Sequence, residues 1–280
     1  MRNKSHFYLF VILLLSFVSC KDEPKAPEDE YKPRTAVEMV TNYGTMVFEL
    51  YDETPLHRDN FIKLVNEKAY DSLLFHRVIE GFMIQGGDPE SKNAPSDSLL
   101  GNGDLGYTVK AEFHPNLFHQ KGALATARED NRDRGSSAIQ FYVVQGKVYN
   151  DSLLDKAEQT INERLARYYV INDERYKSLW DSLQKAIKDE NEVVYERYND
   201  RLDSIVKTYK SVQTYKIPET QRMVYKTQGG TPTLDQNYTV FGQVIKGIKV
   251  VDSIAAVKTD ANDRPIQNVR ILSVRLLDRE

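Results

Sequence analysis

The sequence is poor in cysteine and almost balanced in charge, and both features exclude whole classes of function. Cys20 is the only cysteine among 280 residues, so neither an intramolecular disulfide nor a metal site built from several cysteines can form. The formal net charge is -3, from 38 Lys plus Arg against 41 Asp plus Glu, which excludes nucleic-acid binding by bulk positive charge. Hydrophobic residues make up 40% and charged residues 28%, as in a globular protein.

The chain also has no apolar run long enough to span a membrane comfortably. Its longest apolar run lies at the N-terminus. A basic start precedes the apolar residues 7–18 (FYLFVILLLSFV), and Ser19 and Cys20 follow them. This run is too short to span a bilayer comfortably and is typical of a secretory signal peptide. A small residue followed by cysteine resembles a bacterial lipobox, although Phe17 stands where leucine is usual. We therefore expect a signal peptide at 1–19 and a lipidated Cys20, with an uncleaved N-terminal anchor as the alternative.

Residues 20–35 are expected to hold the lipidated cysteine and a flexible tether. Three prolines and dense charge within 21–35 (KDEPKAPEDEYKPRT) predict an extended segment. The acyl chains of such a terminus anchor a protein stably to a membrane. Lys21 and the acidic pair after it resemble the signal that sends some lipoproteins to the outer face of the outer membrane, and an ordinary charged linker is the equal alternative. We expect a location in the bacterial cell envelope, with the outer membrane favoured and its face left open.

Two parts of the chain, 36–146 and 228–280, have the alternating pattern of β-strands. The first two strands meet around residues 42–44, which is typical of a hairpin. A helix is expected at 52–66, with Thr54 as N-cap and Pro55 at the first helical position. Further β-rich runs lie between turn-rich segments and predict a closed or nearly closed antiparallel barrel; they are residues 74–78, 82–85, 123–127, 140–144, 239–244 and 269–277.

The segment between these two parts, residues 147–227, is different in kind. It contains no glycine and one proline, Pro218. Apolar residues recur in steps of three and four, which predicts two or three long amphipathic helices. They would form a helical hairpin on the order of 40 to 50 Å long. Either this insertion is structurally inert, or it is an arm that clasps protein substrates near the site that its ends flank.

Residues 75–88 (FHRVIEGFMIQGGD) are the most specific part of the sequence. They resemble the signature of the cyclophilin family of peptidyl-prolyl cis-trans isomerases, and GALATAR at 122–128, IQFYVV at 139–144 and LDQNYTVFGQV at 234–244 match the family in the same order. The resemblance implies a mainly β fold: an eight-stranded antiparallel barrel capped by two helices, the second at about 249–256. The long α-helical segment is then an insertion within one catalytic domain.

A catalyst that isomerises the peptide bond before proline needs few chemical groups. Rotation is slow because the nitrogen lone pair is delocalised into the carbonyl, with a barrier of about 18 to 20 kcal/mol. A catalyst needs an apolar slot for the proline ring and a hydrogen-bond donor that favours the twisted amide. It needs no nucleophile and no cofactor, and the histidines lack metal-ligand spacing. Within the signature, Arg77 is the residue expected to supply this donor.

The resemblance also assigns the substrate-binding residues. Tyr142 stands where phenylalanine is usual, Tyr238 replaces a histidine and Arg128 an asparagine, while Phe75 and His76 are expected to be structural. Thr233 replaces a tryptophan that helps to bind cyclosporin, so weak inhibition by cyclosporin is expected. The expected substrate-binding residues are Phe82, Met83, Gln85, Ala127, Arg128, Gln140, Tyr142, Leu234 and Tyr238.

These observations predict a peptidyl-prolyl cis-trans isomerase that acts on X-Pro bonds in exported or envelope proteins and assists their folding. Its partners would be unfolded or other proline-containing proteins, with no nucleic acid, no metal and no cofactor. Two alternatives stay open: a module that binds proline peptides without catalysis, and a scaffold lipoprotein built on the helical insertion.

Overall fold

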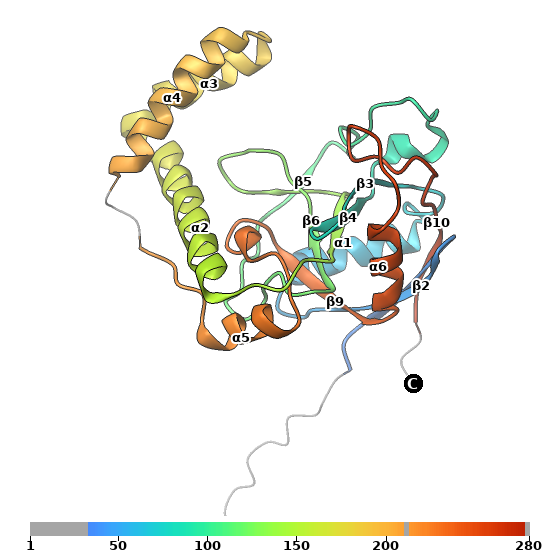
Figure 1. The fold of residues 1–280 in the computed structure, drawn as a ribbon. Coiled ribbons are helices and arrows are strands. Elements are labelled where there is room, and N and C mark those ends of the chain that lie inside the picture. The colour runs from blue at the N-terminus through green and yellow to red at the C-terminus, as the bar shows by residue number, and fades with distance from the viewer. Residues whose placement is uncertain (1–32, 210–212, 278–280) are drawn as a thin grey trace, which may run out of the picture. The chain divides into compact units, whose positions relative to one another are not determined.

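The computed structural model describes residues 33–209 and 213–277 (Figure 1). The expected signal peptide and Cys20 lie outside these residues, so the structure does not test those predictions. None of the described helices is long and apolar enough to cross a membrane.

Eight antiparallel strands form one curled sheet in the order β10-β1-β2-β9-β6-β8-β4-β3. The two edge strands approach each other through a bridge between Leu74 and Arg270, and the nitrogen of Phe75 donates to the Val269 carbonyl at 2.9 Å. This contact brings the sheet close to a closed barrel, and the expected fold class is confirmed. The strands are β1 (Ala36–Thr41), β2 (Gly44–Leu50), β3 (Phe75–Ile79), β4 (Met83–Gly86), β6 (Ala123–Thr126), β8 (Phe141–Val144), β9 (Val240–Lys246) and β10 (Ile271–Leu276).

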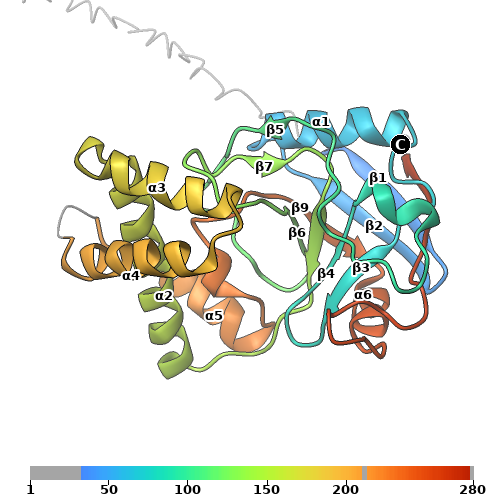
Figure 2. The ribbon, with the colours of Figure 1, turned by 90° about the horizontal axis from the view of Figure 1, so that it is seen from above.

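Two helices pack on this sheet, α1 (Pro55–Asn66) and α6 (Ile248–Ala255), and Figure 2 shows the strands between them. Thr54 is the N-cap of α1, but its side chain makes no capping hydrogen bond. The distant Glu112 does so instead, because its carboxylate accepts from the backbone nitrogens of Leu56 at 3.1 Å and His57 at 3.0 Å. The helix therefore begins where the sequence predicts, but its free N–H groups find a partner that local sequence does not reveal.

Alternate residues of β8 serve two different clusters. Phe141 and Val143 belong to the main core inside the sheet, where aromatic rings lie with centroids 4.8 to 6.0 Å apart. Tyr142 and Val144 belong to a second cluster on the other face. Because side chains alternate along a strand, the same strand supports the core and one wall of the candidate site.

The insertion contains three long helices, in agreement with the two or three expected, and a fourth, short helix that was not expected. Asp173 ends the first helix and its carboxylate accepts from the nitrogen of Arg175, and the Asn191 side chain caps a later helix through Val194. The longest helix, α2, has 22 residues and is therefore ~33 Å long. The helices are α2 (Asp151–Asn172), α3 (Lys177–Lys188), α4 (Glu192–Thr208) and α5 (Glu219–Thr227).

The insertion has two separate apolar clusters. The base cluster joins the first half of α2 to α5 and holds Leu154, Ala157, Ile161, Ile217 and Tyr225. The tip cluster joins the end of α2 to α3 and α4, and it holds Val170, Ile171, Leu179, Trp180, Leu183 and Leu202.

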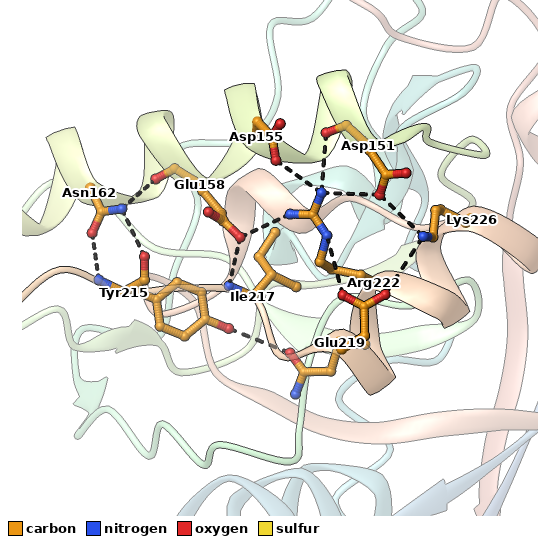
Figure 3. Close-up of polar contacts among 10 residues, drawn as sticks. Asp151, Asp155, Glu158, Asn162, Tyr215, Ile217, Glu219, Arg222 and Lys226 are labelled. Carbon is orange, nitrogen blue, oxygen red and sulfur yellow. Dashed lines mark hydrogen bonds and ion pairs between the residues drawn. The ribbon is translucent and has the colours of Figure 1, made fainter.

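Polar contacts also fasten α5 to α2 (Figure 3). The Arg222 guanidinium lies among carboxylates of α2 and donates to Asp155 at 2.9 Å and Glu158 at 3.0 Å. Further along α2, the Asn162 side chain accepts from the nitrogen of Tyr215 and donates to its carbonyl. These contacts fix the returning chain beside the first half of α2.

The remaining short elements lie around the sheet. A separate pair of strands consists of β5 (Thr108–Val109) and β7 (Ser136–Ser137). Three short 3-10 helices are present among the described residues, η1 (Pro89–Asn93), η2 (Glu174–Tyr176) and η3 (Pro232–Leu234).

Candidate active site

Strand register places the central site residues in one row across four neighbouring strands. Arg77 of β3 pairs with Gln85 of β4, Gln85 with Tyr142 of β8, and Tyr142 with Ala125 of β6. Residues that lie opposite each other on neighbouring strands project from the same face of the sheet. A register irregularity between Phe75 and Arg77 re-aims the chain at the start of this row.

Arg77, Gln85 and Tyr142 of this row line a cavity of about 180 Å³. Its walls combine two cations with apolar and aromatic groups. Arg77 and all the expected substrate-binding residues except Gln140 line it: Phe82, Met83, Gln85, Ala127, Arg128, Tyr142, Leu234 and Tyr238. Met83, Tyr142 and Leu234 are buried, so the slot is preformed and suits a compact saturated ring.

The Arg77 guanidinium lies at the rim, with 44% of its side chain exposed. Its Nε donates to the Asp263 carboxylate at 3.4 Å, a long and exposed ion pair that holds the group only weakly. Among the residues that the structure describes, the two terminal nitrogens have no hydrogen-bond partner, so both can donate to a ligand. The backbone of Asp263 packs on the same strand, because Val78 donates to its carbonyl at 2.8 Å. No sequence pattern predicts this partner.

Gln140 lies outside the cavity lining and acts on Gln85 instead. Its amide oxygen accepts from Gln85 Nε2 at 3.0 Å, while its own amide donates to the carbonyls of Gly101 and Gly103 at 2.9 and 2.7 Å. Gln140 is buried, and these bonds fix its orientation. Gln85 is thereby held with its side-chain oxygen available as an acceptor.

The last residues of the signature organise the loop that holds Gln140. Asp88 is fully buried, and its carboxylate accepts from the nitrogens of Glu90 at 2.8 Å and Gly101 at 2.5 Å. Gly87 has φ +98°, and a Cβ there would lie 2.4 Å from the Ile139 carbonyl, so only glycine fits. These signature positions therefore act through the loop that presents its carbonyls to Gln140.

A buried polar chain lies directly behind the cavity. The Tyr142 hydroxyl is 2.9 Å from Nε2 of His119, whose Nδ1 is 2.7 Å from Asp235, and the Tyr225 hydroxyl donates to the same carboxylate at 2.6 Å. Burial, followed by the charges of its neighbours, raises the pKa of Tyr142 well above its usual value. The hydroxyl that Tyr142 adds relative to phenylalanine is thus satisfied by His119, a partner that sequence reasoning did not find. Because Tyr225 belongs to α5, this series of hydrogen bonds links the insertion to the wall of the cavity.

Arg128 contributes through its side chain as well as its backbone. Its guanidinium lies 5.1 Å from the centroid of the Tyr238 ring, and its Nε donates to the Asn237 carbonyl at 2.9 Å. The pair forms one edge of the cavity, with a cation stacked on an aromatic ring. The resemblance predicts Arg128 as a substrate-binding residue, and the structure shows that its side chain adds a charged edge to the cavity.

The sequence predicts no metal-binding role for the histidines. His57 is buried between Glu112 and the Ser136 hydroxyl, at 2.7 and 3.0 Å from its two ring nitrogens. Within 33–209 and 213–277, no group of three His, Cys, Asp or Glu side chains is placed to hold a metal ion.

Comparison with known proteins identifies the family. The model of cyclophilin type peptidyl-prolyl cis-trans isomerases matches residues 36–162 and 181–276. The chain belongs to this family. A Staphylococcus haemolyticus (strain JCSC1435) protein that carries a peptidyl-prolyl cis-trans isomerase name is 30% identical over 244 residues, covering 87% of this chain and 91% of the relative. A Staphylococcus aureus (strain USA300) protein with the same name is 28% identical, covering 90% and 96%.

A solved cyclophilin has the same fold. The crystal structure of a Cryptosporidium parvum cyclophilin type peptidyl-prolyl cis-trans isomerase aligns with a TM-score of 0.52 and 18% identity, over 88% of this chain and 99% of that one. A second structure of that protein was determined in the presence of the dipeptide Ala-Pro, with a TM-score of 0.51. At this identity the likeness concerns the fold, and the site must be argued from the residues of this chain.

Proposed function

We propose that this cyclophilin accelerates cis-trans isomerisation of X-Pro bonds in exported or envelope proteins and so assists their folding. The observation that carries the proposal is the cavity that combines a preformed apolar slot with the partly free guanidinium of Arg77 at its rim. Its volume of about 180 Å³ suits a proline ring and leaves the flanking chain in the open groove.

In this mechanism the slot holds the proline ring and the rim lowers the rotational barrier. Phe82, Met83 and Tyr142 present flat or adaptable apolar surfaces to the ring. The side-chain oxygen of Gln85 accepts from the backbone of the substrate. As the bond twists, its nitrogen regains lone-pair character, and a donor from Arg77 binds that state better than either planar isomer.

The size of this effect is set by the uncatalysed barrier. Lowering it by roughly 7 to 8 kcal/mol gives about a 10⁵-fold to 10⁶-fold acceleration. No covalent step is required, because the twisted state differs from the ground states only in charge distribution and geometry. Binding and one charged donor are therefore sufficient.

The test is a proline-isomerisation assay on a short X-Pro peptide, beside a measurement of peptide binding. The proposal predicts turnover that grows linearly with enzyme concentration. Binding without turnover would instead support a module that holds proline peptides, and neither binding nor turnover would support a scaffold role for the barrel.

We also propose that the protein is a lipoprotein of the bacterial cell envelope, anchored through Cys20. The apolar run at 7–18, the lipobox-like end at Cys20 and the charged tether support this location. Labelling with a radioactive fatty acid should modify the wild-type protein and not a Cys20→Ala variant. Equal labelling of both proteins, or none of the wild type, would contradict the proposal.

A role in protein folding also gives the helical tip a function. We propose that α3 and α4 hold protein substrates near the groove and raise the local concentration of prolyl segments. Replacing 174–209 by a short glycine-serine linker should preserve turnover of a peptide but weaken catalysed refolding of a protein. The cut must spare α5, because Tyr225 belongs to the polar chain behind Tyr142. Equal losses on both substrates would count against this role.

A further inference from the structure

A second cavity, of about 230 Å³, adjoins the proline cavity and is completed by the insertion. The two cavities share Arg128 and Tyr238 as lining residues. Helix α2 supplies Arg164, Arg167 and Tyr168 to the second one. The insertion therefore adds a wall to the substrate groove immediately beside the proline slot.

This second cavity is strongly cationic. Four arginines line it, Arg128, Arg134, Arg164 and Arg167, and Asp130 is its one lining carboxylate among the residues that the structure describes. Asp130 is 76% exposed and lies 3.5 Å from Arg128, so it offsets little of the charge.

The four arginines are not equally available. Arg134 lies between two rings, with its guanidinium carbon 3.8 Å from the centroid of Tyr168 and 4.4 Å from that of Phe113. Arg167 donates to Asp203 at 2.7 Å. Arg164 is exposed and donates to the Thr233 carbonyl, and no carboxylate in the described part of the chain pairs with it. Arg164 is thus the group most free to take an anionic ligand.

A third cavity beside the proline slot has the reverse charge. It has a volume of about 290 Å³, shares Gln85, Ala127 and Arg128 with the slot and is lined by the carboxylates of Asp104, Glu129 and Asp133. An acidic substrate residue is therefore attracted to the cavity that α2 completes and repelled by the carboxylates of this one.

We propose that α2 extends the substrate groove and that Arg164, with its neighbours, selects X-Pro segments carrying an acidic residue on the side of the proline that passes Tyr238. The inference rests on the proposed isomerase function and names the substrate class of the same site. Arg128 and Tyr238 line both cavities, so the two cavities are adjacent. An extended substrate chain advances about 3.3 Å per residue. The acidic residue of the substrate should therefore lie within about three positions of the proline. A planar guanidinium binds a carboxylate with paired, charge-assisted hydrogen bonds.

The test uses the full chain in detergent and peptides in which Glu replaces Gln at each position within about three residues of the proline. We expect Glu to raise kcat/KM about three- to tenfold on one flank only. Arg164→Gln should abolish the gain, and Arg164→Glu should transfer it to peptides with Lys. Lys156→Glu, an equal charge change at an exposed position of the same helix, should keep the wild-type preference.

The outcomes separate the two proposals. No turnover of any peptide by the wild type overturns the proposed function and the inference with it. Turnover without a one-sided preference for Glu, or a preference that persists in Arg164→Gln, overturns the inference alone. If Arg164→Gln does not fold, Arg164→Met is measured in its place, and a preference for Glu that persists there has the same meaning.

Discussion

The sheet and the tip of the insertion differ in how their side chains meet. In the sheet, site residues distant in sequence lie in one row because strand register joins them, as in the pairing of Arg77 with Gln85 and of Gln85 with Tyr142. In the tip, one apolar cluster of neighbouring helices is separate from the clusters that support the cavity. The comparison suggests that the cavity depends on the sheet and on the base of the insertion, while the tip can change independently.

The largest expected effect comes from removing a large core side chain in each region. Phe141→Ala removes a ring at the centre of the main core and should lower the free energy of unfolding of the sheet by about 3 to 5 kcal/mol. Leu183→Ala should destabilise only the tip, by about 2 to 5 kcal/mol. Fluorescence of Trp180, the only tryptophan of the chain and part of the tip cluster, reports on the tip. Hydrogen exchange of the β8 amides reports on the sheet.

Trp180 fluorescence and hydrogen exchange of the β8 amides together test whether the tip unfolds independently of the sheet. If Leu183→Ala and Phe141→Ala shift both signals equally, sheet and tip unfold as one cooperative unit. The independence of the tip would then be wrong.

A smaller effect is expected on acidification, and it should appear in the sheet alone. Burial, the largest cause, lowers the pKa of His76 from 6.5 to about 4. The unfolded chain therefore binds a proton that the folded state rejects, so the stabilisation is complete above pH 6.5 and is lost as the pH falls towards 4. The loss should reach about 3 kcal/mol.

Urea unfolding between pH 7 and pH 4 measures this loss, with His76→Gln as the comparison. The wild type should lose stability more steeply than the variant, and Trp180 fluorescence should show no such difference. Parallel curves for the two proteins would show that His76 does not titrate as proposed.

The polar contacts that join α5 to the wall of the cavity should contribute less to the free energy of unfolding than the groups above. Tyr225→Phe removes the donor to Oδ2 of the buried Asp235, and leaving that oxygen without the bond should cost about 1 to 3 kcal/mol. Tyr149→Phe is the matched control, because Tyr149 packs against the same base cluster and no described hydrogen bond involves its hydroxyl. Chemical unfolding should separate the two variants. Equal stabilities would mean that the polar chain does not couple α5 to the cavity.

The smallest effect is expected for the charged contacts of the base. Arg222→Ala removes the cation that lies among three carboxylates of α2 (Figure 3). Because those contacts are partly exposed, the loss should be about 1 kcal/mol or less and should shrink as salt is added. Lys185→Ala, which removes an exposed pair with Asp189 in the tip, should change thermal stability even less. A larger loss for Lys185→Ala would reverse the expected order.

The sequence predicted the sheet well because its information is local and periodic. Short apolar runs between turn residues define the strands, and the run at 75–88 identifies the family and contains Arg77 and Gln85 of the row of site residues. In the structure, Arg77, Phe82 and Tyr142 line one cavity.

What the sequence could not predict depends on polar contacts between distant residues. Glu112 caps α1 from far along the chain, His119 satisfies the hydroxyl of Tyr142, and Asp263 approaches Arg77. No periodic pattern encodes such pairs. The short helix α5 was not predicted, because its 9 residues after Pro218 span too few turns to display an apolar period.

The most direct measurement is the exchange rate between cis and trans isomers of an X-Pro peptide, followed by NMR with wild type, Arg77→Lys and Arg77→Ala. Because we propose Arg77 as the donor to the twisting amide, Arg77→Ala should reduce catalysed exchange by about 10² to 10³-fold. Arg77→Lys should recover only part of it, since an ammonium lacks the paired donors. Thermal stability should change little, because the side chain is 44% exposed. Exchange at the wild-type rate in a folded Arg77→Ala variant would contradict the account.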